Sequence, residues 1–152
     1  MSAYIDLCGH KVFSYEWANN GEPVVLLHGG LSYSEKIEAY LLPAVIDTHH
    51  VFAYDRTGHG RTGNQEGSIH FEFQTNELIA YLEDVVKEPA HLIGVSDGGN
   101  IALMAAIARP DLVRSIITIG ANSHFSQVRM NLDVPTPSPE EIELHTLISP
   151  DP

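Results

Sequence analysis

The sequence predicts an α/β fold in which helices cover a mostly parallel sheet of about six strands. Two observations predict it. Short continuous apolar runs, typical of strands buried on both faces, alternate with longer segments whose apolar residues recur at helical spacing. A pattern typical of a small antiparallel hairpin precedes these alternating units. Because repeated strand–helix units place successive strands in parallel, most of the sheet is expected to be parallel.

The strands are predicted from short apolar runs and from the turns that bound them. Residues 4–7 and 11–15 flank Gly9 and His10 and predict the hairpin. The later runs are too short for helices and are expected to form buried strands. These runs are residues 24–27, 51–54, 91–95 and 115–119.

Three helices are expected between these strands. Apolar residues at helical spacing predict a helix over residues 37–45, which Pro43 is expected to kink or restart. Residues 78–86 have one apolar face and a charged remainder, which is typical of a helix on a sheet. Residues 101–108 are apolar all round, which predicts an enclosed helix.

The composition limits which binding partners and which cellular compartment are expected. The chain of 152 residues has 20 acidic and 8 basic residues and a formal net charge of −12, which argues against nucleic acid or an anionic membrane as a partner. The single cysteine excludes an intrachain disulfide. The first residues lack a signal-peptide pattern, and no apolar run approaches the roughly 20 residues of a membrane span. We therefore expect a soluble cytoplasmic protein.

The chain changes character after its first 126 residues. Residues 1–126 carry the strand–helix units, whereas residues 127–152 form a proline-rich acidic segment. Three prolines lie within residues 135–139, and no Lys or Arg follows Arg129. We expect the proline-rich stretch to be a semi-rigid linker or a loop that leaves the core, followed by a short helix over residues 140–148.

The segment GVSDGG at residues 94–99 indicates a nucleophile elbow. It follows a predicted strand and precedes a predicted helix, the context in which G-x-S-x-G places a serine on a sharp, strained turn. Gly94 and Gly98 are expected because a Cβ at either position would collide with the crossing strand and helix. Ser96 is thus the candidate nucleophile. The alternative is a glycine-rich turn without chemistry.

A second glycine-rich loop supplies candidate oxyanion donors. His28, Gly29 and Gly30 follow the strand over residues 24–27, where such enzymes provide an oxyanion amide. Gly30 is the expected donor, with Leu31 as the alternative, and the N–H of Asp97 is the expected donor at the elbow. His28 is expected to organise the loop, and the Asp97 carboxylate also suits a helix N-terminus.

The motifs together resemble the α/β-hydrolase superfamily, in particular its valacyclovir-hydrolase-like and esterase-like members. HGG, DRTGHGRT, GVSDGGN and IGAN occur in the order of that family, and the resemblance covers residues 4–126. It implies an eight-stranded sheet, of which this chain would be the N-terminal portion lacking the last two strands. It also implies a lid that begins in the proline-rich segment, and a structural, non-catalytic turn at residues 55–62.

The resemblance implies a triad whose acid and histidine follow the serine along the chain. His124 directly follows the sixth predicted strand, and His145 lies on the predicted lid helix, so neither matches the catalytic position. Asp111 is most simply a turn residue. The triad is therefore expected to be incomplete in this chain.

The function expected is that of the N-terminal portion of a serine hydrolase that cleaves a small ester or amide without a cofactor. The serine argues against a dehalogenase, while haloperoxidase-like activity and carbon–carbon bond hydrolysis remain open. The alternative is a non-catalytic module that binds a ligand or a protein. Because residues 115–119 would form an exposed strand edge, we also expect self-association or a complementing C-terminal segment.

Overall fold

The computed structural model describes residues 1–68 and 70–122, and its centre is a sheet of six strands. The strand order is β1-β2-β4-β3-β5-β6. The first two strands are antiparallel to their neighbours, and the other strands pair in parallel, so the predicted mostly parallel sheet is confirmed. The strand bounds are β1 Ser2–Leu7, β2 His10–Trp17, β3 Pro23–Leu27, β4 His50–Asp55, β5 Ala90–Val95 and β6 Val113–Ile119.

The predicted hairpin joins β1 to β2 through a two-residue turn. Leu7 pairs with His10, which leaves Cys8 and Gly9 as the central residues. Their φ values are 51° and 83°, and such positive values at both positions match the twist of the flanking strands.

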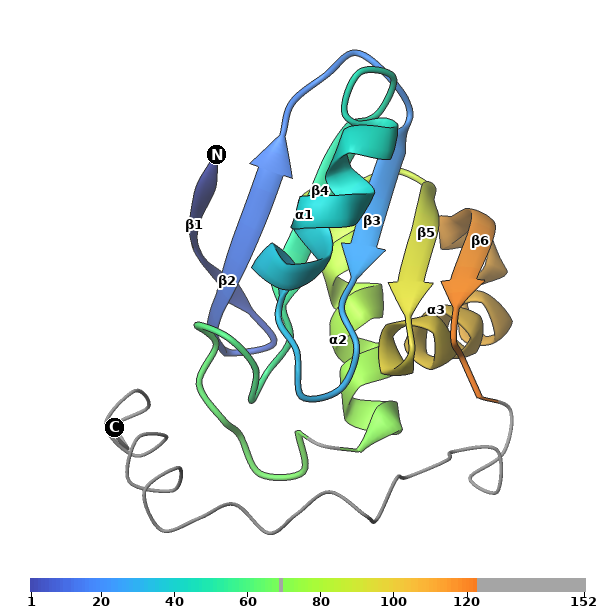
Figure 1. The fold of residues 1–152 in the computed structure, drawn as a ribbon. Helices are drawn as coiled ribbons and strands as arrows, with labels where there is room; N and C mark the ends of the chain where they lie inside the picture. The colour runs from blue at the N-terminus through green and yellow to red at the C-terminus, as the bar shows by residue number, and fades with distance from the viewer. Residues whose placement is uncertain (69, 123–152) are drawn as a thin grey trace, which may run out of the picture.

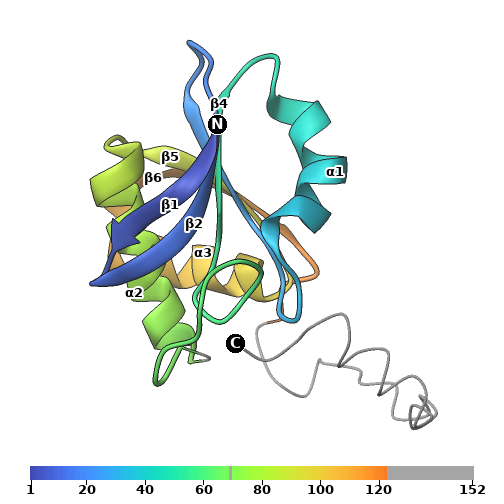
Figure 2. The same ribbon diagram turned by 90° about the vertical axis from the view of Figure 1, so that its left-hand side faces the viewer.

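Helices cover both faces of the sheet (Figures 1 and 2). Helix α1, Ser34–Val45, lies on one face, and α2, Phe71–Tyr81, and α3, Asp97–Ala108, lie on the other. A π-helical turn, η1 Leu82–Val86, continues α2, and a short 3-10 turn, η2 Pro110–Leu112, follows α3. The helix α1 does not restart at Pro43, because this proline lies in its last turn and few helical hydrogen bonds follow it.

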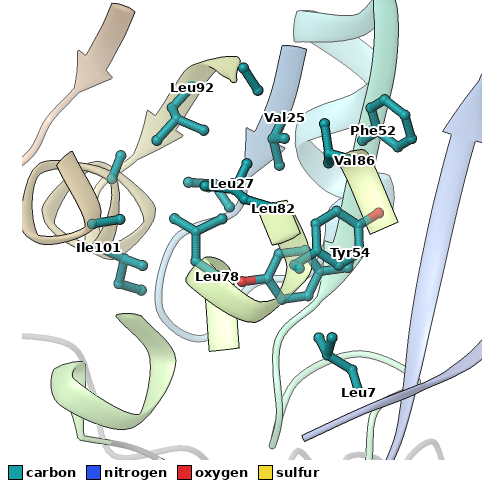
Figure 3. Packing of buried hydrophobic residues seen from close by; sticks show 14 of the residues in the cluster. Leu7, Val25, Leu27, Phe52, Tyr54, Leu78, Leu82, Val86, Leu92 and Ile101 are labelled. Carbon is teal, nitrogen blue, oxygen red and sulfur yellow. The ribbon is translucent and has the colours of Figure 1, made fainter. Parts of the chain in front are cut away.

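The buried side chains form two clusters, one on each face of the sheet. The larger cluster lies between the sheet and the helices α2 and α3, and Figure 3 shows it. The smaller cluster lies under α1 and includes Ile37. Strand β3 contributes alternately to both, with Val25 and Leu27 in the larger cluster and Val24 and Leu26 in the smaller one. This central strand is buried at every position, as its continuous apolar run predicts.

The structure corrects two predictions of burial at the edge of the sheet. Helix α3 buries Ile101 on its inner side, but Ile107 on its outer side is 83% exposed, so the predicted enclosed helix is wrong. Strand β6 is largely exposed rather than buried, because it pairs only with β5 and forms an edge of the described sheet. An apolar composition alone does not ensure burial, because burial depends on what packs against the segment.

Two further predictions concern other parts of the chain. The proline-rich segment 127–152 and the helix predicted within it lie outside the described residues. Among the helices in the described ranges, none is long and apolar enough to cross a membrane.

Candidate active site

The turn between β5 and α3 carries the serine that the sequence singles out. Ser96 lies between Val95, the last residue of β5, and Asp97, the first residue of α3. Its backbone has a φ of 50° and a ψ of −117°, a conformation that costs a non-glycine residue about 1–3 kcal/mol. The Ser96 N–H donates to the carbonyl of Ile119, 2.7 Å away, which ties the turn to β6. The strained turn predicted at Ser96 is confirmed.

The two glycines of the elbow allow the strands and α3 to approach each other closely. A Cβ built on Gly94 would lie 2.4 Å from the carbonyl oxygen of Gly98. A Cβ built on Gly98 would lie 2.4 Å from the carbonyl oxygen of Leu27 and 2.6 Å from that of His28. Because both obstacles are backbone atoms, neither position accepts a side chain without a movement of the main chain. The predicted reason for these glycines is confirmed.

The N-terminus of α3 presents backbone amides at the serine. The amides of Gly99 and Asn100 donate to the carbonyl of Ser96, at 2.9 and 3.2 Å. The amide of Asp97, the first residue of α3, has no acceptor within the helix. A helix N-terminus with such amides favours negative charge, so the position suits an oxyanion.

The loop after β3 runs past the serine. A Cβ built on Gly29 would lie 3.4 Å from the Ser96 Cβ, so the loop and the elbow are in van der Waals range. A Cβ built on Gly30 would lie 2.2 Å from the Oδ2 atom of Asp97. Leu31, the alternative donor, has a φ of 52° and a fully exposed side chain. The fold thus brings together Ser96, Asp97 and Gly30, while their roles stay predictions.

His28 is a buried part of this loop. The N–H of Arg56 donates to its Nε2 atom at 3.1 Å, so the Nδ1 atom carries the proton and donates to the Gly29 carbonyl at 2.8 Å. Burial, and then the positive charge of Arg56, lowers the pKa of His28 to about 2. A neutral imidazole with both nitrogens occupied organises the loop, as the sequence predicts, and is unsuited to proton transfer.

The guanidinium of Arg56 is the main site feature that sequence reasoning missed. Arg56 is fully buried, and its Nη1 and Nη2 atoms donate to the carbonyls of His28 and Gly29 at 2.6 and 2.9 Å. Burial lowers the pKa of Arg56, and the nearby carboxylates of Asp97 and Glu77 act in the opposite direction. The only signal in the sequence was a charged residue placed directly after a buried strand.

Asp55 and Glu77 fix the rest of the turn that follows β4. Asp55 accepts from the amides of Ser34 and Arg61 at 2.8 and 3.0 Å. Glu77, buried on α2, accepts from the amide of Thr57 at 3.2 Å and also from its hydroxyl, and burial raises the pKa of this carboxyl. These bonds agree with the structural role expected for residues 55–62.

The chain is similar in sequence to known proteins. The sequence profile of the family described as alpha/beta hydrolase fold matches residues 22–142. The chain belongs to the α/β-hydrolase family. It is 27% identical over 114 residues to Karrikin insensitive 2 receptor CA of Petunia hybrida, with 70% of this chain and 41% of the receptor covered. It is 30% identical over 100 residues to the putative carbamate hydrolase RutD of Pseudomonas savastanoi pv. phaseolicola, with 65% and 39% covered.

The solved structures agree with this family. A marine microorganism esterase superimposes with a TM-score of 0.66 at 26% identity, with 72% of this chain and 41% of the esterase covered. This α/β-hydrolase chain spans about two fifths of the length of the curated relatives it matches.

The described part of this α/β-hydrolase places no histidine in hydrogen-bonding contact with the Ser96 hydroxyl. The ring of His59 lies 5.0 Å from that of His28 between centroids. His59 is half-buried and has its Nδ1 atom 3.2 Å from the carbonyl of Thr57. Asp111 is exposed and paired with Arg109 at 2.7 Å, in agreement with a turn residue. His124 and His145 lie outside the described residues. Within residues 1–68 and 70–122, no cluster of His, Cys, Asp and Glu is suited to a metal ion.

Proposed function

We propose that this chain is the nucleophile-bearing portion of a serine hydrolase that cleaves a small ester or amide. The observation that carries the proposal is the backbone of Ser96, which has a φ of 50° on the turn between β5 and α3 and faces the glycine loop after β3. A strained serine at this place in an α/β-hydrolase is expected to be a nucleophile. The match to a putative carbamate hydrolase and the likeness to an esterase support the same class of reaction.

The proposed reaction begins with attack of the Ser96 Oγ atom on the substrate carbonyl carbon. The carbonyl oxygen becomes an oxyanion and accepts hydrogen bonds from the amides of Asp97 and Gly30. A histidine takes the hydroxyl proton and returns it to the leaving alkoxide or amine, and an acid orients that histidine. Water then hydrolyses the acyl-enzyme. We propose that this histidine and acid lie outside residues 1–152.

A chimaera tests this function with a built-in comparison. Residues 1–122 replace the matching region of the marine microorganism esterase, which keeps the rest of its own chain. We expect residues 1–152 alone to hydrolyse p-nitrophenyl acetate barely above background, with little change on Ser96→Ala. The chimaera is expected to be faster by orders of magnitude, and to lose that rate on Ser96→Ala but keep it on Ser115→Ala, a serine on β6.

Two outcomes oppose the proposal in different ways. A chimaera whose turnover survives Ser96→Ala means that Ser96 is not the nucleophile. Robust turnover by residues 1–152 alone, lost on His124→Ala or His145→Ala, means that the base lies within this chain.

The second candidate is a module that binds a ligand without turning it over. The similarity to a protein named as a receptor favours it. A folded chimaera that shows no turnover, and whose affinity for an ester analogue is the same with and without the Ser96→Ala substitution, is the result expected of this alternative.

A further inference from the structure

We infer that Arg56 and His28 are positioning residues that set the direction of the Gly30 N–H by holding the carbonyl of the preceding residue. The inference rests on the proposed function, because it takes the Gly30 amide as an oxyanion donor. The sequence predicted only a structural role for the turn after β4. The buried arginine on that turn would, in addition, orient a group of the active site.

A single peptide plane links the carbonyl of Gly29 to the N–H of Gly30. The carbonyl of Gly29 and the N–H of Gly30 belong to the same trans peptide unit, so the two groups point in opposite directions. Any group that fixes the carbonyl therefore fixes the amide. The Gly29 oxygen accepts from Arg56 Nη2 at 2.9 Å and from His28 Nδ1 at 2.8 Å. A rotation of this peptide plane would break both bonds at once.

The loop needs these hydrogen bonds because its own residues restrict the orientation of the peptide plane very little. Gly29 and Gly30 have no side chain to restrict their dihedral angles. Leu31, the next residue, has a φ of 52° and an exposed side chain that packs on nothing in the described structure. The orientation of the peptide between Gly29 and Gly30 therefore depends on its hydrogen bonds.

The two donors are themselves held in place by hydrogen bonds to each other and to the same loop. Arg56 is fully buried and uses Nη1 to bind the carbonyl of His28 at 2.6 Å, as well as Nη2 for Gly29. Its main-chain N–H donates to His28 Nε2 at 3.1 Å, which leaves the Nδ1 proton of that imidazole for Gly29. Arg56 thus contacts the peptide directly and also through His28. The planar, two-pronged guanidinium suits two adjacent carbonyls, whereas an ammonium lacks that geometry.

The direction of the Gly30 N–H is measurable without any catalysis. Residual dipolar couplings of the ¹⁵N-labelled chain of residues 1–152 report the orientation of each N–H vector in a common frame. In the unaltered protein, the Gly30 coupling is expected to fit one N–H axis, parallel to that of the Gly29 carbonyl. In Arg56→Lys and Arg56→Met, we expect this coupling to change or to average toward zero, while couplings in β5 and α2 stay the same.

A matched control separates positioning from general stabilisation. Arg114 also binds a backbone carbonyl, that of Pro89 at 2.8 Å, but it lies near the start of β6, at the opposite end of the sheet from the elbow. Arg114→Met is expected to leave the Gly30 coupling unchanged. An unchanged Gly30 coupling in folded Arg56→Lys or Arg56→Met overturns the inference, whether or not Ser96 is a nucleophile.

A further measurement covers the case in which neither Arg56 variant folds. In the unaltered protein, hydrogen bonds from both Nη atoms block rotation of the guanidinium, so its Nη protons are expected to give separate resonances. A single averaged Nη signal for Arg56 overturns the inference. In an active chimaera, Arg56→Lys is expected to lower kcat at least about tenfold with little change in KM, since one oxyanion donor contributes roughly 10²–10³ in kcat. Equal loss in Arg114→Met opposes a positioning role.

Discussion

The carboxyl ends of β3, β4 and β5 differ sharply from the flank made by β6 and α3. At the carboxyl ends, buried polar groups such as Arg56 and Glu77 hydrogen-bond to residues distant in the sequence. On the flank, the large apolar side chains of Ile107 and Ile117 are 83% and 56% exposed. The first region is held by buried hydrogen bonds, although the Arg56 Nε atom has no partner among the described residues. The second region leaves apolar groups without cover among those residues.

This difference shows which parts of the fold residues 1–122 stabilise by themselves. It also shows which surface needs a further segment or another molecule to cover it. The elbow and the glycine loop are held by backbone contacts and buried hydrogen bonds within the described residues, so their geometry is expected to persist in this chain. The flank combines a strand edge that is unpaired among the described residues with exposed isoleucines, a surface that favours association. We propose that a complementing segment or a second copy covers it.

The largest effect is expected at the elbow, from Gly98→Ala. Its new Cβ would lie 2.4 Å from the Leu27 carbonyl oxygen, so β3 and α3 must separate. We expect the free energy of unfolding to fall by about 3 kcal/mol or more, measured by urea denaturation. Gly63→Ala is the control, because a Cβ there has no neighbour within 4 Å. Equal effects of the two substitutions would mean that the close approach at the elbow is unimportant.

The next largest effect is expected on the pH dependence of stability, and it tests the buried His28 of the glycine loop. The pKa of His28 is about 2 in the folded protein against an ordinary 6.5, so the unfolded chain binds a proton between these values and the folded chain does not. Stability therefore falls as the pH drops below 6.5, with a contribution of up to about 1.4 kcal/mol per pH unit. His28→Asn keeps a donor for Gly29 and removes the titration. Its unfolding free energy is expected to depend less steeply on pH between 4 and 6, and parallel curves would contradict the assignment.

The smallest effect on stability is expected on the flank. Ile107→Glu replaces an exposed side chain, so the free energy of unfolding should stay within about 0.5 kcal/mol. The same change adds charge to the apolar surface and should lower the apparent mass in light scattering. Gln65→Glu adds the same charge to an exposed loop residue and should leave association unchanged. A stable monomer of the unaltered chain at tens of micromolar would rule out self-association through this flank.

The same two regions explain what the sequence predicts and what it does not. The elbow was predictable because its glycines, its serine and the start of the adjoining helix lie within six consecutive residues and act locally. The bonds from Arg56 to residues 28 and 29 were not predictable, because only the folded sheet brings the ends of β3 and β4 together. In addition, charged residues are usually exposed, so the sequence gives no reason to expect a buried arginine. The burial of α3 and β6 was overpredicted, because an apolar pattern does not reveal what covers a segment.

The most direct test of the proposed nucleophile is the position of the acyl group during turnover. The chimaera is mixed with p-nitrophenyl acetate, quenched in acid within the first turnovers, digested and mapped by mass spectrometry. We predict an acetyl group on Ser96, absent from Ser96→Ala, in the peptide that spans the end of β5 and the start of α3. Turnover with Ser96 unmodified and the acetyl group on another side chain would contradict the proposed function.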